Sequence, residues 1–272
     1  MTISSENRMD LKARLLRKDI VTLSHETKTA HLGSCLSCAD ILLAVYGGGL
    51  RISPDLVDDP DRDRLVFSKG HCALALACAL ARHGFCSFAH LRQKFNRPGG
   101  LQEHPNYRYL PGVETASGSL GHGLPLGLGM ALASRIQKRS FRVCVVIGDG
   151  ETNEGSIWEA ALLAGRRMGN LCVVVDFNRW QATDRSCEVT ALEPLADKWR
   201  AFGWEAVECD GHDPGRLREL LASFGGSDRP LAIIAHTVKG KGVSFMEDDN
   251  NWHYRIPNEE ELAKALRELD PS

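Results

Sequence analysis

Residues 142–178 read RVCVVIGDGETNEGSIWEAALLAGRRMGNLCVVVDFN, and this stretch decides the fold. Two short runs of mainly β-branched residues, VCVVI and LCVVV, flank a segment with helical spacing. Strands that alternate with helices are typical of βαβ units, in which a parallel sheet carries helices on both faces. The alternation continues through WEAVEC, DPGRLRELLASF and PLAIIAH to residue 236. We therefore predict an α/β chain with a largely parallel sheet and helices on both faces.

Polar residues follow both of these predicted strands. Asp149 lies between Gly148 and Gly150 directly after the first run, and Asn178 comes shortly after the second. The carboxyl ends of parallel strands meet at one edge of the sheet, where ligands bind, so we expect both side chains there. One carboxylate and one amide oxygen form a sparse ligand set, which holds Mg²⁺ when a phosphate supplies further oxygens. The alternative is a tight Gly-Asp-Gly turn, with Asn178 as a cap or turn residue.

The composition gives no sign of a nucleic-acid or membrane partner. The 272 residues carry 33 Lys and Arg against 35 Asp and Glu, so the chain has no strongly basic balance. The sequence has no apolar run of about 20 residues, and its start, MTISSENRMD, has no apolar signal-peptide core. Nine scattered cysteines favour reduced thiols over a disulfide framework. We therefore expect a cytoplasmic protein.

The first half of the chain predicts helices followed by an irregular segment. Apolar spacing predicts helices over residues 9–28, 37–46 and 72–83, the second with Ser37 as its N-cap and Asp40 in its first turn. Residues 96–127 are rich in Gly and Pro and show no clear period. A compact domain rarely contains such a long irregular stretch unless it has a function.

The segment from residue 148 to 181 resembles the thiamine-diphosphate signature, in which GDG precedes a distant Asn. Its internal EG and WEA are similar to the transketolase form of that signature. The likeness extends over about residues 10–260. Four further segments resemble transketolase segments in the same order: TAHLGSCLSCADILLAVY, DRLVFSKGHCALALACAL, LQEHPNYRYLPGVETASGSLGHGLPLGLGMALA and HTVKGKGVSFMEDDNNWHYRIP.

This resemblance implies a fold, an activity and a partner. It implies the thiamine-diphosphate-binding fold, with residues 1–272 as one diphosphate-binding (PP-type) domain and the pyrimidine-binding domain on a separate C-terminal transketolase subunit. Two copies of each chain would form the assembly. With thiamine diphosphate and Mg²⁺, it would transfer a two-carbon ketol unit from a ketose (phosphate) to an aldose, and this chain alone would be inactive. Two alternatives stay open: a subunit of a thiamine-dependent 2-oxoacid decarboxylase or dehydrogenase, and a non-catalytic scaffold subunit.

The resemblance also implies roles for single residues. Asp149, Asn178 and the backbone carbonyl of Trp180 would bind Mg²⁺, and Glu154 would contact a proton-relay network across the subunit interface. The catalytic histidines that line the channel above the thiazolium ring would be His31, His71, His104 and His253. Further contacts with the cofactor would come from Gly118, Ser119, Leu120, Gly148, Gly150, Glu154, His71 and His253.

The roles of several histidines, cysteines and lysines depend on their chemistry and on their surroundings. Imidazole suits proton transfer from and to a sugar hydroxyl, because it titrates near neutrality. The pair Cys35 and Cys38 is predicted to be core thiols, since a zinc site would need two more ligands. The Lys239–Gly242 stretch is either a solvated loop or a mobile cover over the cofactor. No catalytic role follows for His25, His83, His90, His212 or His236, and His122 stays open.

Three departures from the usual transketolase pattern leave the substrate open. They are Leu32-Gly33-Ser34-Cys35 after His31, Glu103 before His104, and Tyr254-Arg255 after His253.

Overall fold

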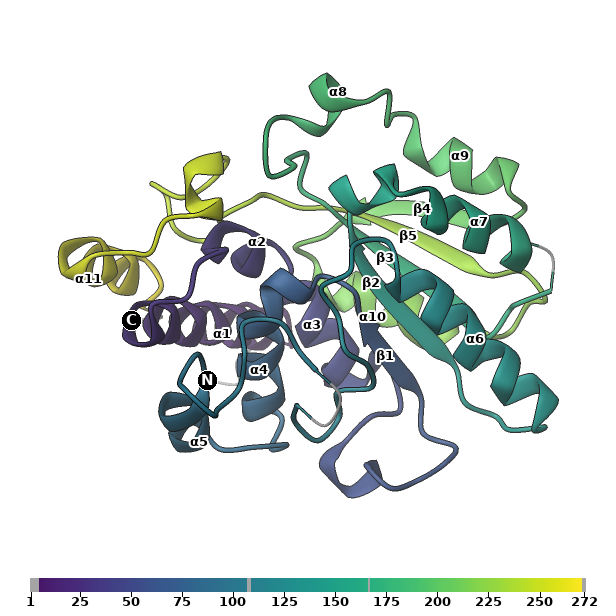
Figure 1. Cartoon of the computed structure of the whole chain (residues 1–272), viewed down its shortest axis with the longest axis horizontal. Coiled ribbons are helices and arrows are strands. Elements are labelled where there is room, and N and C mark those ends of the chain that lie inside the picture. The colour runs from purple at the N-terminus through teal and green to yellow at the C-terminus, as the bar shows by residue number, and fades with distance from the viewer. Residues whose placement is uncertain (1–4, 107–108, 166, 271–272) are drawn as a thin grey trace.

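Five parallel strands form the centre of the protein in the computed structural model, which describes residues 5–106, 109–165 and 167–270. The strand order is β1-β2-β3-β5-β4, so the last strand in sequence lies inside the sheet. Figure 1 shows helices packed on both sides of this sheet, which confirms the predicted α/β fold. The strands are β1 (Arg64–Phe67), β2 (Val143–Gly148), β3 (Leu171–Phe177), β4 (Glu205–Asp210) and β5 (Leu231–His236).

The apolar strands are long runs because both of their faces are buried. Side chains alternate between the two faces of a strand, so Cys144 and Val146 of β2 belong to one core cluster and Val145 belongs to the other. Every residue of β3 is buried. Strands covered on both faces read as continuous apolar sequence, which explains the runs VCVVI and LCVVV.

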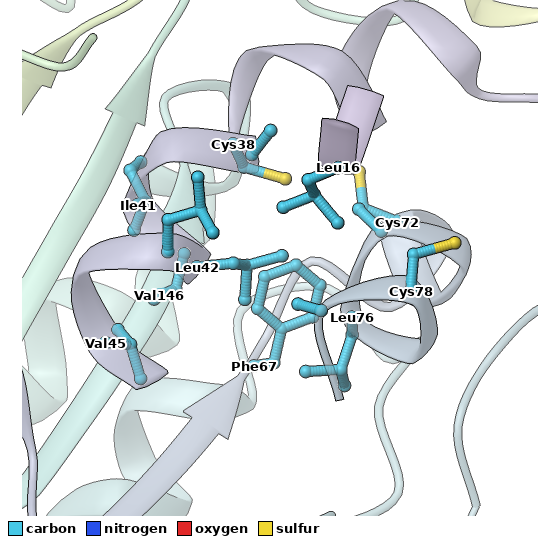
Figure 2. Close-up of a cluster of buried hydrophobic side chains, with 14 of the residues drawn as sticks. Leu16, Cys38, Ile41, Leu42, Val45, Phe67, Cys72, Leu76, Cys78 and Val146 are labelled. Carbon is cyan, nitrogen blue, oxygen red and sulfur yellow. The ribbon is translucent and has the colours of Figure 1, made fainter. Parts of the chain in front are cut away.

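One face of the sheet is covered by the N-terminal helices and α10. Figure 2 shows part of this core, where Leu42 and Val45 lie near Phe67 of β1 and Cys72 and Cys78 lie near Leu76. Burial of these side chains contributes about 25 cal/mol for each Å² of apolar surface removed from water. The helices here are α1 (Ser5–Thr27), α2 (Leu32–Ser37), α3 (Ala39–Ala44), α4 (Ala73–Arg82) and α10 (Pro214–Ser223).

The other face is covered by α6, α7 and α9, whose core includes Trp199 and Trp204. Both indoles are fully buried, and their ring centroids lie 4.9 Å apart. These helices are α6 (Gly123–Ile136), α7 (Gly155–Ala164) and α9 (Leu195–Ala201). The remaining helices are α5 (Phe88–Lys94), α8 (Ser186–Val189) and α11 (Glu259–Glu268), and shorter helical turns span Val45–Gly49, Pro54–Leu56, Gly70–Cys72, Gly150–Asn153 and Asn250–His253.

Three local expectations differ from the structure. The helix predicted over 37–46 is divided: α2 ends at Ser37 and α3 begins after Cys38. Ser37 does not cap α3, because its hydroxyl lies 2.6 Å from the Asp176 carboxylate and 3.0 Å from the Ser34 carbonyl and donates to one of these acceptors. The irregular stretch is shorter than expected, since α6 begins at Gly123. Strand β1 was not predicted as a strand, because only four residues form it.

The cysteine prediction is confirmed. All nine cysteines lie within the described residues as free thiols, and Cys35 and Cys38 are fully buried in the core. Among the helices of the described ranges, none is both long and apolar enough for a membrane span.

Candidate functional site

Asp149 and Asn178 lie at the same edge of the sheet. Gly148 of β2 pairs with Asp176 of β3 in parallel register, and Asp149 directly follows Gly148. The Asp149 amide donates to the Asp176 carbonyl at 3.3 Å, and Asn178 directly follows the last residue of β3, Phe177. Both polar side chains are buried, with 1% of Asp149 and 6% of Asn178 exposed. The two strand ends, with these residues, are called the rim below.

The Asp149 carboxylate is held in place by hydrogen bonds and forms no ion pair with the described residues. One oxygen accepts from the Ser186 hydroxyl (2.7 Å) and the other from the Gly150 amide (3.0 Å). Burial raises the pKa of Asp149 to about 6, although the Ser186 hydrogen bond lowers it and the Asp176 charge raises it further. A buried acid in this state fits a site that takes up a cation, because a positive charge would restore its ionised form.

Asn178 also has a free acceptor position. Its amide oxygen accepts from the Trp180 backbone amide at 3.0 Å, and its Nδ2 lies 3.4 Å from the Ser37 hydroxyl. An amide oxygen has two lone pairs, so one remains for a further ligand. The rim thus offers one carboxylate and one amide oxygen, which fits Mg²⁺ when a diphosphate supplies other oxygens. Within the described residues, no group of three or more His, Cys, Asp or Glu side chains could hold a metal.

A glycine loop lies against the rim through Glu151. The Gly121 amide donates to the Glu151 carboxylate at 3.0 Å, the Gly148 amide lies 3.4 Å from the same carboxylate, and the Ser68 hydroxyl donates to it as well. Gly121 has a φ of +78°, and a Cβ there would come within 2.5 Å of the Glu154 side chain. Glycine therefore allows the loop to approach Glu154 at the start of α7.

Four histidines from separate segments lie close together, and His31 is near each of the other three. The His31 ring centroid lies 4.9 Å from that of His253, 5.5 Å from that of His71 and 6.4 Å from that of His104. The His71 and His253 centroids are 5.8 Å apart. These four residues form the histidine cluster. In Figure 1, the yellow segment with the turn Asn250–His253 lies beside α2, which His31 precedes.

The cluster also depends on backbone contacts. The His31 amide donates to the His253 carbonyl at 2.9 Å, and the Gly240 amide donates to the Gly33 carbonyl at 2.9 Å. His31 has a φ of +63°, a left-handed backbone conformation that residues other than glycine rarely adopt. The buried Nδ1 atom of this half-buried ring has no hydrogen-bond partner among the described residues. An unpaired polar atom of this kind fits a site that binds a polar ligand.

Burial keeps the imidazoles of His31, His71 and His253 neutral. It lowers the pKa of His253 to about 3, with a further contribution from Lys239 and then His31. It also lowers the pKa of His71 well below its usual value, reinforced by Lys69 and His31. The pKa of His31 is lowered by burial, then by His104 and Lys239. These three rings are therefore proton acceptors at neutral pH, whereas the sequence suggested imidazoles that titrate near neutrality.

The chain matches one known protein family over almost its whole length. The family described as "Transketolase, thiamine diphosphate binding domain" matches residues 5–270.

The chain belongs to the transketolase family.

Its relatives include proteins of similar length. An apulose-4-phosphate transketolase subunit of Phocaeicola vulgatus is 38% identical over 267 residues, which cover 96% of this chain and 93% of that protein. The 6-deoxy-6-sulfo-D-fructose transketolase subunit SqwG of Clostridium sp. is 38% identical over 271 residues, covering 98% of each. The solved transketolase of Campylobacter jejuni matches with a TM-score of 0.86 at 27% identity, over 99% of this chain but 43% of that one. The chain therefore spans less than half of that transketolase.

Two lysines of this transketolase-family chain are buried, and the sequence assigned no role to Lys69 and left the role of Lys239 open. Lys69 is 2% exposed and forms an ion pair with Asp176. Lys239 is 1% exposed; its Nζ donates to the Asn250 amide oxygen (2.6 Å) and lies 3.4 Å from the His253 Nδ1. Burial lowers the pKa of Lys239 to about 8, with a further contribution from the Lys69 charge. The solvated-loop interpretation is therefore wrong for Lys239. Hydrophobic periodicity cannot reveal a buried lysine, because its burial depends on partners that are distant in the sequence.

Other residues singled out in the sequence have ordinary surroundings. Glu103 accepts a hydrogen bond from the Asn96 side chain at 3.0 Å. Tyr254 is exposed, with its ring centroid 4.7 Å from that of His253. The Trp180 indole donates to Asp248 at 2.8 Å. In the glycine loop, Gly118, Ser119 and Leu120 are exposed.

The adjacent helices α6 and α7 carry exposed apolar side chains. Leu126 and Ile136 of α6 are 44% and 80% exposed, and Leu162 and Leu163 of α7 are 68% and 72% exposed. The two helices pack against each other, so these side chains extend over neighbouring helices. We call these four residues the leucine face. Large apolar groups gathered on a surface indicate a protein contact.

Proposed function

We propose that this chain is the diphosphate-binding subunit of a split transketolase. With a second chain it binds thiamine diphosphate and Mg²⁺ and transfers a two-carbon ketol unit from a ketose (phosphate) donor to an aldose acceptor. The observation that carries this proposal is the convergence of four histidines, with His31 at their centre, near a rim that fits a cation. Relatives of nearly the same length are named as single subunits of transketolases, which supports a separate partner chain.

In this proposal the rim residues bind and the histidines move protons. Asp149, Asn178 and the Trp180 carbonyl would hold Mg²⁺, and Gly118, Gly148 and Gly150 would lie against the cofactor. Thiamine diphosphate, when bound, supplies the electron sink that allows a carbon–carbon bond of the ketose to break. The other proposed cofactor contacts are Ser119, Leu120, Glu154, His71 and His253.

The neutral histidines would act on the sugar hydroxyl groups. A neutral imidazole has a free lone pair, so His31, His71 or His253 can accept a hydroxyl proton and later return it. Lys239 lies beside His253 and carries the positive charge that a negatively charged ligand needs. Because Lys239 and the rim acids are buried, their charges act in a medium that screens them less than water does.

The partner would dock on the leucine face and near Glu154. Glu154 precedes α7, and the exposed residues Leu162 and Leu163 lie on that helix. A partner there would cover apolar surface and bring its own groups to Glu154. The proposed assembly contains two copies of each chain, with the pyrimidine-binding domain on the partner and residues 1–272 as one diphosphate-binding domain. The free thiols agree with a cytoplasmic location.

The test is a reconstitution with a separately encoded C-terminal transketolase subunit as the partner. Each chain alone, and the mixed pair with thiamine diphosphate and Mg²⁺, would be assayed with apulose 4-phosphate, 6-deoxy-6-sulfofructose, fructose 6-phosphate and a 2-oxoacid as donors. We expect ketol transfer from a ketose only when both chains are present. Turnover of the 2-oxoacid alone would favour the decarboxylase alternative, and the absence of turnover with any donor would favour a scaffold.

A further inference from the structure

A further, partly buried histidine, His212, lies behind the loop that carries Lys239. His212 follows β4, and its Nδ1 lies 2.7 Å from the Asp40 carboxylate of α3. Its Nε2 accepts a hydrogen bond from the backbone amide of Val238 at 2.8 Å. The ring therefore joins α3 to the segment that leaves β5, although neither partner belongs to the histidine cluster.

These two hydrogen bonds define the state of the ring. A backbone amide can only donate, so the His212 Nε2 must carry a lone pair, and the proton must be on Nδ1. Nδ1 then donates to Asp40, which is ionised: burial opposes ionisation, but the Arg17 charge and the His212 hydrogen bond outweigh it and lower the pKa of Asp40. The Arg17 guanidinium forms an ion pair with the same carboxylate. A doubly protonated ring could not accept from Val238.

The segment held by His212 leads directly into the proposed site. Val238 precedes Lys239, whose ammonium group contacts Asn250 and lies near His253. The Lys239 carbonyl accepts from the Asp248 amide at 2.8 Å. A shift of the Val238 amide would therefore move the ammonium group and the turn Asn250–His253 with it.

We propose that His212 is a positioning residue that fixes the loop from Thr237 to Gly242, and with it the Lys239 ammonium group, through an imidazole that must stay neutral. Its effect on turnover rests on the proposed function, but its effect on the loop does not.

Positively and negatively charged groups both lie near His212. Arg17 Nη2 lies 3.5 Å from Nδ1, and the Asp210 carboxylate accepts from the His212 backbone amide at 2.8 Å. Asp40 and Arg17 come from α3 and α1. The hollow beside the ring is further lined by Asp10, Asp213, Arg216, Arg218, Glu219 and Lys241.

The first test is a nitrogen NMR measurement on the full chain with ¹⁵N-labelled histidine. At pH 7.5, we expect His212 to show an unprotonated Nε2 and a protonated Nδ1, assigned by loss of the signal in His212→Gln. A protonated Nε2 in the wild-type chain would overturn the proposal, whatever the behaviour of any variant.

The second test measures hydrogen exchange in residues 237–243 of three variants. His212→Ala removes the acceptor, so the protection factor of the Val238 amide should fall at least about 10-fold, the loss of one buried hydrogen bond. In His212→Gln the side-chain oxygen can accept from Val238 while its NH₂ donates to Asp40. Protection of the Val238 amide should therefore persist in His212→Gln.

His236→Gln is the matched control. This histidine ends β5 but pairs with Glu208 on the surface, so the protection factors of the loop should equal those of the wild type. Unchanged protection of the Val238 amide in His212→Ala, or a loss of protection in His212→Gln as large as that in His212→Ala, would contradict the proposal.

The reconstituted pair gives a further readout. His212→Ala should lower kcat more than it changes KM, and His212→Gln should restore kcat. Should the pair show no ketol transfer at all, the proposed function fails while the NMR and exchange results still decide the role of His212.

Discussion

The rim and the histidine cluster adjoin each other but are held by different kinds of structure. Asp149 and Asn178 follow neighbouring parallel strands, so the hydrogen bonds of the sheet set their separation. The four histidines come from separate loops and turns, joined by single contacts such as the one from the His31 amide to the His253 carbonyl. Loops open more readily than central strands. The rim is thus a rigid binding part, whereas the cluster depends on the loops that carry it.

The charges of the two regions also differ. Burial makes ionisation harder in both, so the pKa of the acid Asp149 rises to about 6 and that of the base His253 falls to about 3. The rim therefore favours an added cation, and the cluster favours an added proton donor such as a hydroxyl group. Under the proposed function, the rim binds the cofactor and the histidine cluster transfers protons, and the substitutions below test this division.

The largest effect is expected from Asp149→Asn in the reconstituted pair. Loss of the only carboxylate proposed as a metal ligand should weaken Mg²⁺-dependent cofactor binding by at least about 100-fold and remove turnover with it. Isothermal titration calorimetry with thiamine diphosphate and Mg²⁺ measures this. Asp197→Asn, on the exposed side of α9, is the control that should leave binding unchanged.

The same variant should stabilise the chain without ligands. Asp149 binds a proton more tightly when folded, because its pKa rises from 3.8 to about 6. The stability it contributes is present below pH 3.8 and is lost as the pH rises through about 6. At pH 7, Asp149→Asn should therefore raise the free energy of unfolding by about 1–3 kcal/mol. Equal stability in denaturant titrations, together with unchanged cofactor binding, would show that Asp149 is only a turn residue.

His104→Ala tests the cluster separately from the rim. His104 is the exposed member of the cluster, so its truncation should barely change stability. We expect kcat to fall by roughly 10²–10⁴-fold, the usual contribution of acid–base catalysis, with the cofactor affinity nearly unchanged. His90→Ala, exposed on α5, should be silent in the same assay. A loss of cofactor affinity as large as that of Asp149→Asn would abolish the distinction between the two regions.

Lys239→Met tests the charge between the two regions. Because the pKa of Lys239 is lowered to about 8, its positive charge is present below that pH and is lost above it. Cofactor affinity in the wild-type pair should therefore decline as the pH rises through about 8. In Lys239→Met the affinity should be about 10-fold weaker at pH 7 and lack this decline. Lys241→Met, in the same loop but more exposed, should retain it.

Leu163→Glu should have the smallest effect on the chain itself. This side chain is 72% exposed, so the free energy of unfolding should change by less than about 0.5 kcal/mol. The affinity for the partner should still fall by about 10-fold, as measured by titration in an analytical ultracentrifuge. Ala222→Glu, exposed on α10 on the opposite face of the sheet, is the control. Equal partner affinity in the two variants would exclude the leucine face as the contact.

The difference between a rim set by the sheet and a histidine cluster set by loops explains which parts of the site the sequence could predict. The position of the rim followed from two apolar runs and from the rule that parallel strands end together, and Asp149 and Asn178 do lie there. The four histidines have no common period, so only their resemblance to transketolase segments grouped them. Their roles remain predictions.

Long-range packing accounts for what was missed. Strand β1 is too short to be distinguished, and Cys38 interrupts a helix that the pattern made continuous. Lys69 and Lys239 are charged residues whose burial depends on partners far away in sequence, Asp176 and Gly33. His212 is likewise explained by Asp40 and Val238, and no local pattern relates these three residues.

The left-handed backbone at His31 has a consequence for attempts to make this protein tolerate heat. A histidine with a φ of +63° is held in a conformation that costs about 1 kcal/mol or more, which a glycine would avoid. Laboratory evolution for survival at high temperature would therefore favour glycine at this position. Selection for turnover would restore the imidazole, so the two pressures act on one codon in opposite directions.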